Sequence, residues 1–215
     1  MRSWAKGPFM NQSLAVSRAG AYASLAAFLV TLPTKEMMDD LRRLACAVCG
    51  DGCVCDFSDV GDAIQVFHDR TSVTCSARFV PLSEQCVYRA ECTKGESWTY
   101  GPVTGSRSSH VLACYRKAGF GFKGIQGFEP VVRSLRPDSL AAECAFMAYL
   151  LNRAACCSQS AESDEQFADA FLREHLSSWV GRAADMSEQT GNDYYAFIVR
   201  LCASFVRADV SAMSA

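Results

Sequence analysis

Apolar residues recur along this chain with the period of an α-helix. Three sets share the spacing i, i+4, i+7 and i+11, which forms one apolar stripe along a helix. These sets are Met37, Leu41, Leu44 and Val48, then Leu140, Cys144, Met147 and Leu151, and finally Tyr194, Ile198, Leu201 and Phe205. No stretch alternates between apolar and polar residues over the length of a strand with turn residues at both ends, so the pattern predicts an all-α fold.

Capping residues mark where several of these helices begin. Thr34 follows a proline and is the expected cap of the first helix, and Asp59 precedes a helix formed by Val60, Ile64 and Phe67. Ser163 and Gln166 form a capping-box pattern before the run "FADAFLREHLSSWV". Asp138 follows Pro137 and is expected to cap the helix that contains Leu140.

Two irregular zones divide the chain. Residues 93–109 are rich in Gly, Ser and Thr, and residues 119–130 contain four glycines. We therefore expect a tail over 1–18, a helical half over 19–92, a linker over 93–109, a second half over 110–208 and a tail over 209–215. The apolar run from Ala19 to Leu32 is too short to cross a bilayer and lacks a cleavage site, which favours a buried amphipathic helix.

Composition narrows the classes of function. The chain has 215 residues, of which 50% are apolar, so it can form a core without disulfides despite its 12 cysteines. Its net charge of -2 offers no broad basic surface for nucleic acid. Without an export signal, the sequence predicts a cytoplasmic protein that is not inserted in a membrane and whose thiols are reduced, buried or bound to metal.

The chain lacks the usual catalytic patterns. Its glycines form no phosphate-binding loop, and His68, His110 and His175 lie far apart in sequence without the spacing of a catalytic zinc site. We predict that the protein is not an enzyme and holds no cofactor. His175 shares a helical stripe with Phe167 and Phe171, which favours a hydrogen-bonded core histidine over a ligand.

Four thiols are concentrated in "CAVCGDGCVC". Cys46, Cys49, Cys53 and Cys55 could bind zinc or an iron-sulfur cluster, because Cys46 and Cys49 are one helical turn apart and the glycines could fold the other two back. A reversible disulfide is a second reading. The close spacing favours a third, in which the cluster is incidental.

Glu143 and Asp138 are the carboxylates of the stretch "RPDSLAAECAFMAYLL". Glu143 lies about 60° from the centre of its helix's apolar stripe, where a carboxylate pairs with a cation or faces a groove. The two residues are about 140° apart around the helix, so they do not form a catalytic dyad.

This stretch resembles the Pro-Asp-His helix start of the TorD/DmsD/NarJ family of redox-enzyme maturation chaperones. "FVPLSEQCVYRAE" (Phe79 to Glu91) is similar to the family's Phe-x-x-Pro and Glu-Ser-x-Tyr segment, and "VLACYRKAGF" and "FLREHLSSWV" resemble its flanking helices. The four motifs occur in order, and the resemblance extends from about residue 20 to residue 207. It implies a compact multi-helix fold of the TorD type.

The resemblance also implies a function. Such chaperones act on molybdopterin-dependent oxidoreductases of the dimethyl sulfoxide reductase type, and many bind the twin-arginine signal peptide or the immature catalytic subunit until the cofactor is inserted. A peptide with two arginines before an apolar stretch requires carboxylates beside an apolar groove. Matching the motifs residue by residue assigns eight residues to this site: Phe79, Pro81, Glu84, Tyr88, Pro137, Asp138, Ser139 and Glu143.

One residue departs from the family pattern. Ser139 occupies the position of the family's histidine, and a serine hydroxyl cannot titrate near neutral pH. The resemblance leaves open whether the protein is a monomer or a domain-swapped dimer. Two other functions also stay open: a thiol-based metal or redox protein that uses Cys46 to Cys55, and a helical scaffold for another protein client.

Overall fold

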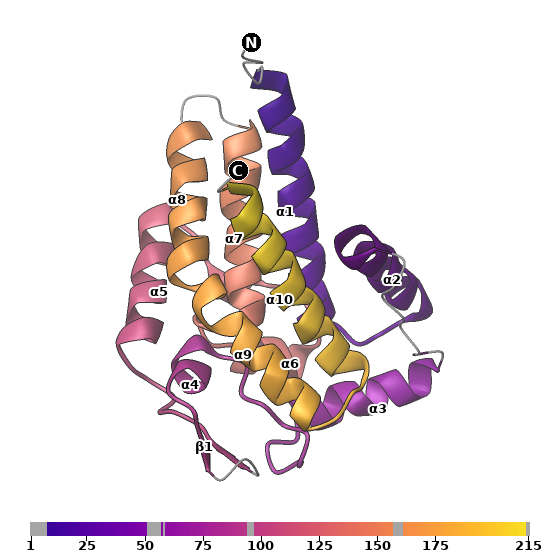
Figure 1. Ribbon diagram of the computed structural model, residues 1–215. Coiled ribbons are helices and arrows are strands. Elements are labelled where there is room, and N and C mark those ends of the chain that lie inside the picture. The colour runs from indigo at the N-terminus through magenta and orange to yellow at the C-terminus, as the bar shows by residue number, and fades with distance from the viewer. Residues whose placement is uncertain (1–7, 51–56, 58, 94–96, 157–160, 214–215) are drawn as a thin grey trace.

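Long helices pack side by side around α7 (Leu140–Cys156) in this computed structural model (Figure 1), which describes residues 8–50, 57, 59–93, 97–156 and 161–213. Helices make up 74% of the described residues, which confirms the all-α prediction. The other elements are α1 (Pro8–Val30), α2 (Lys35–Cys49), α3 (Val60–Thr71), α4 (Glu84–Tyr88), β1 (Glu91–Thr93), β2 (Ser97–Thr99), α5 (Ser106–Ala118), η1 (Phe122–Gly124), α6 (Glu129–Ser134), α8 (Ala161–Glu174), α9 (Leu176–Gln189) and α10 (Tyr194–Met213).

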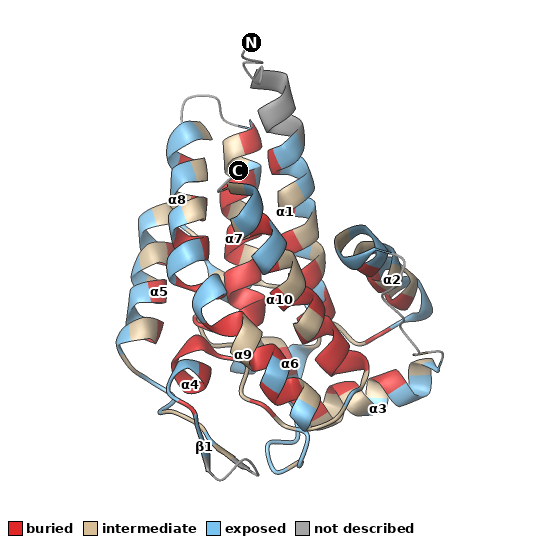
Figure 2. Ribbon diagram, viewed as in Figure 1, coloured by how far each residue is buried: buried red, intermediate tan, exposed pale blue. Residues whose placement is uncertain are grey.

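Helix α7 is buried on nearly every side (Figure 2). Its predicted stripe of Leu140, Cys144, Met147 and Leu151 is fully buried, and Phe146 on another face is buried as well. Alanines between these residues let α1 and α8 approach closely. Because α1 belongs to the first helical half and α7 to the second, the two halves share one hydrophobic core.

Helix α1 contains the apolar run that begins at Ala19. Tyr22, Leu25 and Leu29 are buried against α7, as expected of a buried amphipathic helix. The helix begins at Pro8, inside the segment 1–18 expected as a tail, and proline suits a first helical turn. No helix in the described part of the chain is long and apolar enough to span a membrane.

The predicted cap of α2 is present, and the residue before α3 is a cap as well. The Thr34 side chain accepts a hydrogen bond from the Met37 amide, and Asp59 accepts one from the Asp62 amide. The buried face of α2 is centred on Met38, Leu41 and Ala45. The expected stripe of α2 is therefore displaced by about one position, with Met37, Leu44 and Val48 half-buried.

Two segments differ from the sequence pattern. Residues 93–109 were expected to be irregular, but β2 lies within them and pairs antiparallel with β1 at their start, with Cys92 opposite Trp98. Trp98 Nε1 donates to Gln189 on α9, so tertiary contacts hold a hairpin too short to show alternation. The run "FADAFLREHLSSWV" is interrupted at His175, between α8 and α9, and α8 begins at Ala161, which leaves Ser163 within its first turn rather than at its cap.

Candidate functional site

The fold pairs the two segments that carry the family-like motifs. Ser83 and Ser139 form an antiparallel β-bridge. On either side of it, the Glu84 amide donates to the Asp138 carbonyl at 2.8 Å and the Leu140 amide donates to the Leu82 carbonyl at 3.0 Å. Residues 79–88 and 137–143 are therefore joined by backbone hydrogen bonds although 53 residues separate Gln85 from Asp138.

Asp138 has a different capping role from the one expected. Its carboxylate is fully buried and accepts from the Gln85 amide at 3.0 Å, so it caps α4 instead of its own helix. Ser139 caps α7, since its Oγ accepts from the Ala142 amide at 3.3 Å. The cap moves by one residue because the backbone around Ser139 pairs with Ser83 and turns the Asp138 side chain toward α4.

An apolar pocket of about 380 Å³ lies beside the paired segments. Phe79, Pro81 and Ser139 of the predicted site line it, together with Leu29, Val80, Leu82, Val131, Leu135 and Leu140. Its charged lining residues are Arg70 and Arg136, and its lining includes no carboxylate. Val103, which is 58% exposed, lies at this pocket and makes it accessible from solvent.

Ser83 also lines the pocket, and its side chain is 2% exposed. Its Oγ has no hydrogen-bond partner among the described residues. A buried hydroxyl without a partner costs free energy, so this atom is available to a group that enters the pocket.

A buried polar cluster lies on the other side of the paired segments. Glu84 and His175 are both buried, and His175 Nδ1 lies 2.8 Å from Glu84 Oε2. Glu143 is buried beside them, where its Oε2 accepts from Trp179 Nε1 at 3.1 Å and its Oε1 has no partner among the described residues. Glu143 therefore faces no groove, because α7 is buried on this side too, and the cationic group beside it is His175.

Burial and neighbouring charges shift the protonation of this cluster. Burial, followed by the charge of Glu84, raises the pKa of Glu143 well above its usual value. Burial lowers the pKa of His175, but hydrogen bonds with Cys114 and Glu84 and the charges of Glu84 and Glu143 outweigh it and raise this pKa to about 10. At neutral pH the imidazole is thus a cation between two carboxyl groups, of which Glu143 holds its proton more tightly than usual.

Arg107 connects the cluster to the surface. Its guanidinium pairs with Glu84 and lies 3.4 Å from the centre of the Tyr88 ring. Tyr88 is 42% exposed, so it is not a core aromatic. The predicted residue Pro137 contributes its carbonyl, which accepts from the Tyr115 hydroxyl at 2.7 Å.

Of the eight predicted residues, three line the pocket: Phe79, Pro81 and Ser139. The three carboxylates, Glu84, Asp138 and Glu143, are buried outside its lining. Sequence reasoning missed Arg107 and the role of His175, although a histidine on an apolar stripe needs a buried partner and so points to a carboxylate elsewhere. It also missed that the fold brings His110, Cys114 and His175 together, with their ligand atoms within 4.8 Å of one another.

The thiol cluster is described only in part. Cys46 and Cys49 are exposed near the end of α2, and Cys53 and Cys55 lie outside the described residues. Metal binding by these four thiols stays a prediction.

Residues 94–185 match a family model described as the nitrate reductase delta subunit. This segment is therefore similar to the NarJ/TorD-type chaperone family. The match confirms the resemblance found in the sequence, and that family acts in molybdoenzyme maturation. It includes Asp138, Ser139, Glu143 and His175 but not residues 79–88, and it covers fewer than half of the 215 residues. No curated protein and no solved structure matches the chain.

Proposed function

We propose that this protein is a chaperone that binds the twin-arginine signal peptide or the immature catalytic subunit of a molybdopterin-dependent oxidoreductase of the dimethyl sulfoxide reductase type, until its cofactor is inserted. The observation that carries the proposal is the apolar pocket beside the two paired motif segments, lined by Phe79, Pro81 and Ser139. At about 380 Å³ its volume falls in the range of ligand pockets, which is about 300–1,000 Å³.

The pocket suits the apolar part of such a peptide and not its arginines. Arg70 and Arg136 line it, and like charges repel. Glu84, Asp138 and Glu143, which the resemblance assigns to the site, are fully buried and outside the pocket's lining. We infer that these carboxylates support the binding surface from within.

A second pocket, of about 470 Å³, supplies carboxylates for the arginines. Asp59, Asp62 and Asp193 line it, together with one cation, Arg78, whose Nη1 lies 3.9 Å from Asp69 Oδ2. It adjoins the first pocket through one ion pair, because Arg70 lines the apolar pocket and its Nη2 lies 2.7 Å from Asp193 Oδ2. Since Asp193 is already paired, Asp59 and Asp62 are the acceptors we propose for the twin arginines.

Titration with a labelled signal peptide of a dimethyl sulfoxide reductase-type catalytic subunit tests the apolar half of the proposal. Val103→Asp introduces a carboxylate at the pocket on an exposed position, so it should weaken peptide binding about tenfold while the protein stays folded. Val73→Asp is the matched control, since Val73 is 39% exposed and outside the pocket's lining, and it should leave the affinity unchanged.

Asp62→Asn tests the arginine half. It should weaken binding of the natural peptide but not of a peptide whose two arginines are replaced by glutamine. Glu162→Gln, an exposed change in the first turn of α8, is the control. The proposal fails if neither the peptides nor the full apo-subunits bind, or if Val103→Asp and Val73→Asp behave alike.

A further inference from the structure

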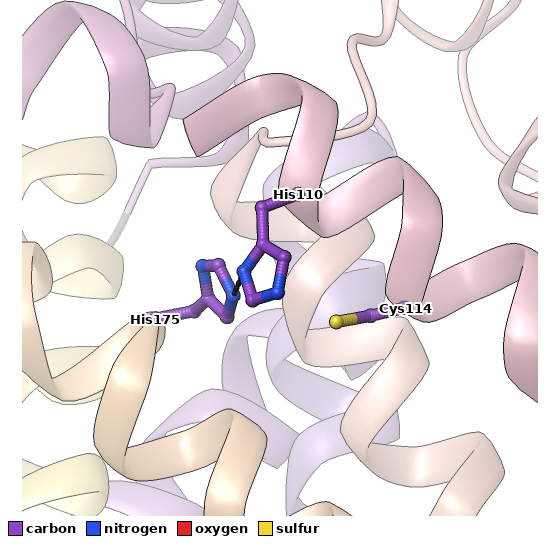
Figure 3. Close-up of side chains that lie close together, drawn as sticks. All are labelled: His110, Cys114 and His175. Atoms are coloured by element: carbon purple, nitrogen blue, oxygen red, sulfur yellow. Dashed lines mark hydrogen bonds between the residues drawn. The ribbon is translucent and has the colours of Figure 1, made fainter. Parts of the chain in front are cut away.

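Three potential metal ligands converge beside the buried polar cluster. His110 and Cys114 are one turn apart on α5, and His175 lies between α8 and α9. His110 Nδ1 is 3.1 Å from His175 Nε2, and the two nitrogens and the Cys114 sulfur all lie within 4.8 Å of one another. Figure 3 shows the two rings facing each other, with the thiol directed toward them. We propose that these three residues bind a zinc ion.

The spacing of the nitrogens suits a tetrahedral zinc site. Two nitrogens that are each about 2.0–2.1 Å from a tetrahedral zinc are about 3.3 Å apart, and a nitrogen and a thiolate sulfur are about 3.6 Å apart. The two imidazoles are therefore within a few tenths of an ångström of the required separation. Cys114 is half-buried on a helix surface, where a small side-chain rotation completes the approach.

The carboxylate of Glu84 orients one ligand. A carboxylate only accepts hydrogen bonds, so its contact of 2.8 Å with His175 Nδ1 assigns the proton to that nitrogen and directs Nε2 at His110. In zinc sites, a ligand histidine usually donates the N–H of its other ring nitrogen to a carboxylate. Without metal, Nε2 shares a proton with His110, and zinc displaces this proton as it does in other histidine sites.

Ligand chemistry selects the metal. One thiolate and two imidazoles suit zinc, whereas magnesium and calcium prefer oxygen ligands. Three protein ligands leave one tetrahedral position open. Glu174 lies on this side, with its Oε1 3.3 Å from His110 Nδ1, so either this exposed carboxylate or a water completes the coordination.

The bound ion would join α5 to the junction of α8 and α9. Glu84, which holds His175, also donates its amide hydrogen to the Asp138 carbonyl, next to the bridge between Ser83 and Ser139 beside the apolar pocket. Zinc therefore stabilises the framework of the pocket without entering it.

Cobalt(II) titration of the full chain tests the site, because a thiolate bound to cobalt gives a near-ultraviolet charge-transfer band. The titration uses the Cys46→Ser/Cys49→Ser background, so that the other thiol cluster does not compete. We expect one equivalent of cobalt to bind, zinc to displace it, and zinc to raise the thermal unfolding temperature. Cys114→Ser should abolish the band and the thermal shift.

Matched variants separate this site from other thiols and histidines. Cys75→Ser removes an exposed thiol elsewhere, and His68→Ala removes a histidine that packs against Phe128, so both should bind cobalt as the parent does. His110→Ala should weaken cobalt binding at least about a hundredfold. The proposal is overturned if the parent binds no stoichiometric cobalt or zinc, or if Cys114→Ser is indistinguishable from Cys75→Ser.

Discussion

The apolar pocket and the buried polar cluster lie on opposite sides of the same two segments, yet their chemistry differs completely. The pocket is apolar, is reached from solvent at Val103, and contains an unpaired hydroxyl at Ser83. Glu84, His175 and Glu143 of the cluster are buried, and Glu84 receives contacts from both His175 and Arg107. The pocket can gain contacts by binding a peptide, whereas a substitution in the cluster removes buried hydrogen bonds and ion pairs.

This difference shows that the segment 79–88 contains both residues that line the pocket and a residue that supports it from the interior. Phe79 and Pro81 face the pocket, whereas Glu84 of the same segment points into the interior. A carboxylate within a binding motif is thus not necessarily a contact with the ligand. Substitutions in the cluster should act on stability first, and substitutions at the pocket should act on binding first.

The largest effect is expected for Glu84→Ala. This change leaves the His175 cation buried without its carboxylate and should cost about 3–5 kcal/mol of unfolding free energy. For a chain of this length the loss corresponds to a decrease of roughly 10 °C in the thermal midpoint. Glu129→Ala removes an exposed partner of Arg133 and should cost at most about 0.5 kcal/mol. Equal losses in the two variants would contradict the burial of the cluster.

Asp138→Ala should have the next largest effect, because Asp138 both accepts a hydrogen bond from the Gln85 amide and pairs with Arg136. It leaves the Gln85 amide buried without an acceptor and should cost about 2 kcal/mol in chemical denaturation. Asp138→Asn retains an oxygen that can accept from this amide and should lose less. If Asn loses as much as Ala, the charge of Asp138 matters more than its cap, and its ion pair with Arg136 becomes the explanation.

The helices and the two motif segments could be predicted from the sequence, but their pairing could not. Helical period and caps depend on neighbours in sequence, which is why the Thr34 cap, the helix after Asp59 and the α7 stripe were identified correctly. The bridge between Ser83 and Ser139 depends on the packing of the whole core. The sequence pattern therefore predicted Asp138 as the cap of α7, whereas Ser139 caps this helix.

The same limit applies to the histidines. His110 and His175 are 65 residues apart in sequence, and no local spacing signals that their rings are in contact. The partner of His175 at the break between α8 and α9 is likewise distant in sequence, since its Nδ1 contacts Glu84. By contrast, the expectation that His175 is a buried histidine with hydrogen bonds needed only its place on an apolar stripe.

The two serines of the bridge should respond in opposite directions to the same substitution. Ser139→Ala removes the cap of α7 and should cost about 1 kcal/mol. Ser83→Ala removes a buried hydroxyl that has no partner in the described structure and should be neutral or stabilising by up to about 1 kcal/mol. Denaturant midpoints of both variants, measured without peptide, provide the test. A clear loss in Ser83→Ala would mean that its hydroxyl is satisfied in the free protein.

The smallest effect is expected for Glu143→Gln, and it should depend on pH. Burial raises the pKa of Glu143 in the folded state. Below its unfolded pKa of about 4.3 the carboxyl group is protonated in both states, so it does not lower the free energy of unfolding there. As pH rises above that value, the unfolded state ionises first and the folded state is disfavoured until the pH passes the raised folded pKa. Glutamine cannot ionise, so the stability of the variant relative to the parent should increase between pH 4 and pH 8.

Glu36→Gln provides a control of opposite sign. Hydrogen bonds to its own amide and to Thr34 lower the pKa of Glu36, so its ionised form favours the folded state above pH 4.3 or so. The stability of this variant relative to the parent should therefore decrease slightly over the same range of pH. Parallel trends in the two variants would show that Glu143 ionises in the folded protein as readily as an exposed glutamate, and the cluster would then be open to water as the pocket is.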